Sequence, residues 1–252
     1  MKTVFMTFAS PRAVAMLFQL KVIGISPDAI IIEKPYLKKR IRTALKRLTL
    51  FQIVKIIWIR LMVYAGNKSY NWLKDDFYYS FSDEIYSITD FNGSQCENLL
   101  KRLKPDLILL GYSPILKDNI IKIPAKGILN AHPGLLPKYR GTNIEGWAIL
   151  NGDPLGVTVH FVDRGIDTGP ILSQRVVELK AGDTYKKIEK RMNLVSGELM
   201  AETVLKIING EELIAVPQQL TEGKLYHRMP ADLRRQAFAK LKSNETGTNP
   251  PA

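Results

Sequence analysis

The sequence has few of the residues on which disulfide frameworks and metal centres depend. Its 252 residues include one cysteine, Cys96, and three histidines, and no two histidines have the spacing of metal ligands. A single cysteine excludes an internal disulfide and a cysteine-rich metal site. We therefore expect catalysis without a metal.

The sequence also lacks an apolar run long enough to cross a membrane. Lys2 precedes apolar residues, but Ser10-Pro11-Arg12 interrupts that run, and Lys55 and Arg60 interrupt residues 51–64. A spanning helix needs about 20 consecutive apolar residues, and a signal peptide needs a longer uninterrupted core. We interpret the first run as a buried strand of a cytoplasmic protein.

Acidic residues are absent from residues 34–74, which hold eleven of the charges that make the net charge +12. We predict a helical basic insertion after the second strand. Its apolar face could pack on the sheet, leaving the basic face in solvent. It could also lie on an anionic membrane, which would make the protein membrane-peripheral, or bind RNA phosphate or a substrate diphosphate.

The remaining pattern predicts an α/β protein with a Rossmann-like, doubly wound, mostly parallel sheet. Strands are expected within residues 3–8, 25–33 and 107–110, the last being a continuous apolar run typical of a buried parallel strand. Helices are expected at residues 11–20, 94–103 and 183–208, with Ser10 as the first N-cap and Asn209-Gly210 as the last C-cap. The carboxyl ends of such strands form the usual ligand site.

The chain divides into a catalytic domain at residues 1–210, which includes the 34–74 insertion, and a small C-terminal extension at residues 211–242. Residues 218–226 predict a short hairpin with a turn at Glu222-Gly223. Residues 243–252 have the composition of a disordered tail.

One amide, one imidazole and one carboxylate lie at the predicted ends of two strands. Asn130 and His132 are two residues apart, so an extended segment directs both side chains to the same face. Asp167 follows a second strand-like run that ends in a glycine-rich turn. We therefore expect Asn130, His132 and Asp167 to meet.

These residues and their neighbours resemble the 10-formyltetrahydrofolate-dependent formyltransferases. The family pattern is an Asn-x-His pair, Leu-Leu-Pro, Arg-Gly and a later Asp-x-Gly. The chain matches it with Leu135-Leu136-Pro137, Arg140-Gly141 and Asp167-Thr168-Gly169, over roughly residues 99–180. The resemblance implies the formyltransferase fold, 10-formyltetrahydrofolate as cosubstrate and Asn130, His132 and Asp167 as catalytic residues.

Formyl transfer explains why these side chains are useful. An amine attacks the formyl carbon, and negative charge develops on the formyl oxygen. The Asn130 amide can donate to that oxygen, as can a protonated His132, while Asp167 favours the imidazolium and can hold a water that relays a proton. His160 is open to two interpretations, a buried neutral imidazole or a residue that lines the cleft. His227 is expected at the surface.

By resemblance, two segments would bind the folate cosubstrate, although Gly111 could simply end a strand. The predicted folate-binding residues are Gly111, Tyr112, Ser113, Pro114, Ile115, Leu116, Val162, Asp163, Gly165 and Ile166.

The amine acceptor is argued by exclusion. Glycinamide ribonucleotide transformylases carry a glycine-rich phosphate loop after the first strand, but here that place reads Thr7-Phe-Ala-Ser-Pro-Arg12. Only about 40 residues follow Gly210, too few for the tRNA-binding barrel of methionyl-tRNA formyltransferases. We expect a nucleotide-linked amino sugar, as in polysaccharide biosynthesis, and no nucleic-acid partner. The two excluded acceptors and a non-catalytic RNA- or membrane-binding relative remain alternatives. The oligomeric state stays open.

Overall fold

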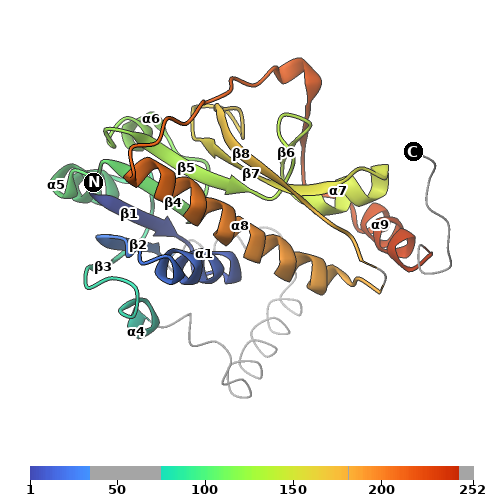
Figure 1. The fold of residues 1–252 in the computed structure, drawn as a ribbon, viewed down its shortest axis with the longest axis horizontal. Coiled ribbons are helices and arrows are strands. Elements are labelled where there is room, and N and C mark those ends of the chain that lie inside the picture. Colours follow the sequence, from blue (N-terminus) through green and yellow to red (C-terminus); the bar gives the residue numbers. More distant parts are fainter. Residues whose placement is uncertain (35–74, 181, 244–252) are drawn as a thin grey trace, which may run out of the picture.

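The computed structural model describes residues 1–34, 75–180 and 182–243 (Figure 1). Apart from Lys34, the predicted basic insertion lies outside the described residues, as does the predicted tail beyond residue 243. Among the described residues, no helix has the length and apolar character to span a bilayer.

A seven-stranded sheet has the order β3-β2-β1-β4-β5-β7-β8. Strands β1 to β5 pair in parallel, whereas β7 and β8 are antiparallel. The bounds are β1 Thr3–Thr7, β2 Ala29–Glu33, β3 Ile85–Ile88, β4 Leu107–Tyr112, β5 Gly127–His132, β7 Leu155–Phe161 and β8 Ile171–Val177. The chain runs from β1 outward through β2 to β3 and then returns past β1 to β4 on its other side. The carboxyl ends of β1 and β4 therefore form a switch point, where ligands bind in such sheets.

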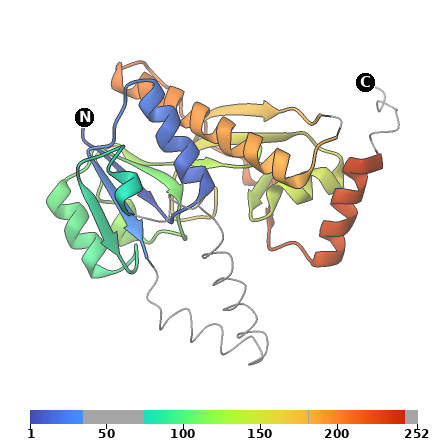
Figure 2. The same cartoon turned by 90° about the horizontal axis from the view of Figure 1, so that it is seen from below.

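Helices cover both faces of the sheet (Figures 1 and 2). On one face lie α1 (Pro11–Val22) and α8 (Tyr185–Ile208), and on the other lie α5 (Ser94–Leu103) and α6 (Asp118–Ile121). Alternation along β1 separates the two cores, because Phe5 packs on the α1 and α8 side and Val4 and Met6 pack on the other. The predicted doubly wound fold is confirmed.

The expected helix starts are also found. The Ser10 hydroxyl accepts a hydrogen bond from the amide of Ala13 at 3.1 Å, so it caps α1. Thr184 caps α8 in the same way, accepting from the amide of Lys187 at 3.3 Å. The one-turn helix α4 (Asp75–Tyr78) leads into β3.

The predicted hairpin at residues 218–226 is wrong. Leu220–Glu222 form a single 3-10 turn, and β9 (Lys224–Tyr226) pairs in parallel with the distant strand β6 (Tyr139–Gly141). The backbone of β9 therefore hydrogen-bonds to β6 and not to another strand within residues 218–226. Gly223 permits the approach, because a Cβ there would lie 1.7 Å from the carbonyl oxygen of Pro137.

The extension ends in α9 (Ala231–Ser243), which packs beside α7 (Ile144–Asn151) at the far end of the sheet (Figure 1). The extension therefore returns to the loops that follow β5.

Candidate active site

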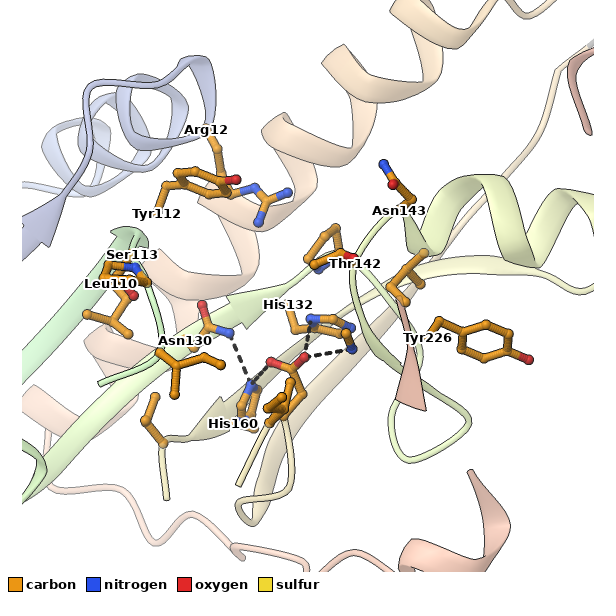
Figure 3. A pocket seen from close by; sticks show the side chains of 18 of the residues that line it. Arg12, Leu110, Tyr112, Ser113, Asn130, His132, Thr142, Asn143, His160 and Tyr226 are labelled. Carbon is orange, nitrogen blue, oxygen red and sulfur yellow. Dashed lines mark hydrogen bonds and ion pairs between the residues drawn. The ribbon is translucent and has the colours of Figure 1, made fainter. Parts of the chain in front are cut away.

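A cavity of about 690 Å³ opens at the switch point of the sheet. It is lined by Ser10, which follows β1. It is also lined by Tyr112 at the end of β4 and by Asn130 and His132 at the end of β5 (Figure 3). The site thus lies beyond the carboxyl ends of the parallel strands, as the sequence predicted.

The structure brings Asn130, His132 and Asp167 to this cavity. Asp167 arrives from the turn between β7 and β8, and its Oδ2 lies 3.4 Å from Nδ1 of His132. The amide of Gly141, at the end of β6, donates to the same Oδ2 at 2.9 Å. Asp167 has a left-handed backbone (φ 54), which is uncommon for a residue with a side chain. The turn therefore holds the carboxylate at a defined point beside the imidazole.

His132 is 3% exposed and uses both ring nitrogens within the protein. Its Nε2 lies 2.8 Å from the carbonyl oxygen of Tyr139 and must donate, because a carbonyl only accepts. Nδ1 therefore faces the Asp167 carboxylate. Burial lowers the pKa of His132, and the Asp167 charge opposes this by favouring the imidazolium. The protonation state of His132 therefore depends on Asp167 staying in place.

His160 combines the two interpretations that the sequence left open. It is 2% exposed and also lines the cavity. Its Nδ1 donates to the carbonyl oxygen of Phe161 at 2.7 Å, so Nε2 is free to accept from the Asn130 amide at 3.2 Å (Figure 3). Burial, followed by the neighbouring His132, lowers the pKa of His160 to about 4. His160 is thus neutral near pH 7, and its 3.7 Å approach to Oδ1 of Asp167 is no ion pair there.

The predicted folate segments line the cavity, apart from Gly111. The place of a Cβ on Gly111 faces the Phe5 ring, 2.6 Å away, and Thr7. Gly111 permits close packing of β4 on β1. The other nine predicted residues line the cavity: Tyr112, Ser113, Pro114, Ile115, Leu116, Val162, Asp163, Gly165 and Ile166.

The cavity is also lined by polar residues that the sequence motifs did not indicate. Arg12 lies beside the Tyr112 ring, 5.9 Å from its centroid, and its Nε donates to Oδ1 of Asn193 at 3.5 Å. Arg12 is the only lysine or arginine lining the cavity in the described part of the chain. Glu145, at the start of α7, is 8% exposed and has no hydrogen-bond or ion-pair partner among the described residues. These residues come from α1, α7 and α8, so no local pattern unites them.

His227 is exposed as expected, but it also lies at the edge of the cavity, next to Tyr226. No group of three or more histidine, cysteine, aspartate or glutamate residues arranged for a metal ion occurs in the described ranges.

A family model described as formyl transferase matches residues 79–204, which is half of the chain. The chain belongs to the formyl transferase family. A methionyl-tRNA formyltransferase from Thermodesulfovibrio yellowstonii is 39% identical over 119 residues, covering 45% of this chain and 39% of that protein. The chain thus spans about half, or less, of the length of the curated relatives that it matches.

Solved formyltransferases share the fold. An N-formyltransferase from Helicobacter canadensis, in complex with folinic acid and dTDP-3-aminofucose, has a TM-score of 0.63 at 18% identity and covers 96% of this chain and 81% of that one. A glycinamide ribonucleotide transformylase from Symbiobacterium toebii has a TM-score of 0.59 at 18% identity, covering 86% and 93%. At these identities the likeness establishes the formyltransferase fold, not the acceptor.

Proposed function

We propose that this formyltransferase moves the formyl group of 10-formyltetrahydrofolate to a primary amine. The observation that carries the proposal is the contact of Asp167 with His132, 3.4 Å apart beside Asn130, in the cavity at the switch point. Membership of the family supplies the reaction class.

Asn130 supplies the donor for the formyl oxygen. One N–H of its amide is held by Nε2 of His160, and the second remains for a ligand in the cavity. Charge that develops on the formyl oxygen during attack is stabilised by such a fixed donor. Because His160 orients the amide before the ligand arrives, little reorganisation is needed.

His132 and Asp167 manage charge and protons. Direct donation from His132 to the formyl oxygen, which the sequence suggested, is not the arrangement seen, since Nε2 donates to Tyr139 and Nδ1 faces Asp167. The imidazolium would instead act through its positive charge. As the amine forms its bond to the formyl carbon, Asp167 accepts the proton that leaves the amine, directly or through a water. The same proton passes to the folate nitrogen as its bond to the formyl carbon breaks. The step needs no covalent intermediate on the enzyme and no metal.

For the acceptor we propose a nucleotide-linked amino sugar. After β1 the chain has no glycine-rich phosphate loop, and Arg12 in the first turn of α1 lines the cavity instead. A guanidinium can bind a phosphate through charge-assisted hydrogen bonds. Glu145 also lines the cavity and presents a carboxylate to an amine or hydroxyl group of the acceptor. Methionyl-tRNA is the second candidate, because relatives found by sequence include several methionyl-tRNA formyltransferases.

An activity assay that supplies one candidate acceptor at a time separates these acceptors. Purified protein with 10-formyltetrahydrofolate would receive dTDP-3-aminofucose, a UDP-linked 4-amino sugar, glycinamide ribonucleotide or methionyl-tRNA, and release of tetrahydrofolate would be followed. We expect turnover with an amino-sugar nucleotide and no loss of activity with chelator. Turnover with methionyl-tRNA alone would replace the sugar proposal, and no turnover despite folate binding would favour a non-catalytic relative.

A further inference from the structure

Gln218, in the segment that follows α8, reaches the catalytic turn. Its side-chain amide donates to the backbone carbonyl of Asp167 at 3.1 Å and to that of Gly169 at 2.6 Å. Gln218 is partly buried, whereas the next residue, Gln219, is exposed. The two glutamines are thus a natural pair for comparison.

The same segment holds Asp167 from its other side. The carboxylate of Asp167 accepts from the amide of Gly141, and Gly141 belongs to β6, whose only partner in the two-stranded sheet is β9 of the extension. Upstream of Gln218, Val216 and Ile171 exchange backbone hydrogen bonds of 2.8 Å, so the segment is fixed where it passes the turn.

The turn needs such support. A left-handed backbone at a residue other than glycine is strained and persists only when its surroundings define it. The carbonyls of Asp167 and Gly169, on either side of Thr168, both accept from the one side-chain amide of Gln218, and this is such a constraint. Removing the donor would leave both carbonyls without this partner and would release the turn that carries the carboxylate.

We propose that Gln218 is a positioning residue for formyl transfer, which clamps the Asp167 turn so that the carboxylate stays on His132. The extension is then a working part of the active site and not only a tail packed on the domain. The catalytic part of this inference rests on the proposed function, but the positioning part does not.

The test compares Gln218→Met, which keeps the length of the side chain but removes its donors, with Gln219→Met as the matched control. Hydrogen exchange of the Gly141 amide, observed by NMR, reports on its bond to Asp167. We expect exchange at least ~10-fold faster in Q218M and unchanged in Q219M. The pKa of His132, followed by its imidazole signals, should fall in Q218M alone, because Asp167 raises it.

Turnover completes the test. With any accepted amine, kcat should fall at least ~10-fold in Q218M, while the KM for the formyl donor changes little. Unchanged Gly141 exchange and His132 titration in folded Q218M would overturn the positioning role. Altered exchange with normal kcat would overturn its catalytic importance. If Q218M does not fold, Q218A with the Q219A control provides the same readouts. Absence of turnover in the unmodified protein would count against the proposed function while leaving both NMR readouts interpretable.

Discussion

The side-chain amide of Asn130 donates to Nε2 of His160 at 3.2 Å, and this contact fixes the states of both residues. Nε2 can accept only because the ring proton lies on Nδ1, which donates to Phe161. The amide nitrogen of Asn130, not its oxygen, therefore faces the imidazole. Protonation of His160 would remove this acceptor and disturb the donor that Asn130 offers to a ligand.

Stability should fall in acid because of His160. Its pKa of about 4 in the folded protein lies below the value of about 6.5 for an unfolded chain. Between these values the unfolded state binds more protons, so the free energy of unfolding falls as pH falls, by at most about 1.4 kcal/mol per pH unit from this residue. Urea unfolding should show that the free energy of unfolding falls less between pH 7 and pH 5 in His160→Gln than in the unmodified protein. Equal losses would contradict a neutral buried His160.

The catalytic residues should be separable from the fold. His132→Ala and Asp167→Asn are each expected to lower turnover at least ~100-fold, because they remove the cation near the developing charge and the proton acceptor. Circular dichroism and the unfolding midpoint would control for structure. Near-normal turnover in either folded variant would refute its role.

Arg12 should affect the acceptor and not the formyl donor. Its guanidinium lines the cavity beside the Tyr112 ring (Figure 3), and it is the only positively charged lysine or arginine side chain among the described lining residues. Arg12→Gln is expected to raise the KM for a phosphorylated acceptor at least ~10-fold, since a charged donor to phosphate is lost. The exposed Arg235→Gln is the control. A rise in the KM for the formyl donor instead would place folate beside Arg12.

Gly111 should matter for packing and not for folate. A methyl group there would lie 2.6 Å from the Phe5 ring, so Gly111→Ala is expected to cost about 1–3 kcal/mol of stability. Folate affinity, measured by titration with folinic acid, should stay near normal in the folded fraction. Tyr112→Ala should weaken folate binding and change stability little, because that side chain lines the cavity and is 52% exposed. Weak folate binding by a stable G111A protein would restore the first interpretation of Gly111.

The sequence by itself determined what depends on near neighbours. The apolar run at residues 3–8 predicted a buried strand, and Ser10 predicted the start of α1. The two-residue spacing of Asn130 and His132 predicted that both side chains lie on the same face, and both line the cavity. Because these features follow from the period of a strand or from hydrogen bonds within one turn, they can be derived without knowledge of the fold.

Only the tertiary structure decided which distant residues support the site. Gln218 bonds to a residue 51 positions away, and β9 finds its partner in β6 instead of within a hairpin. The state of His160 depends on burial and on His132 and Asp167, which belong to other elements. Such contacts leave no periodic trace in the sequence, because the pairing that satisfies a buried donor or charge is chosen by packing across the sheet.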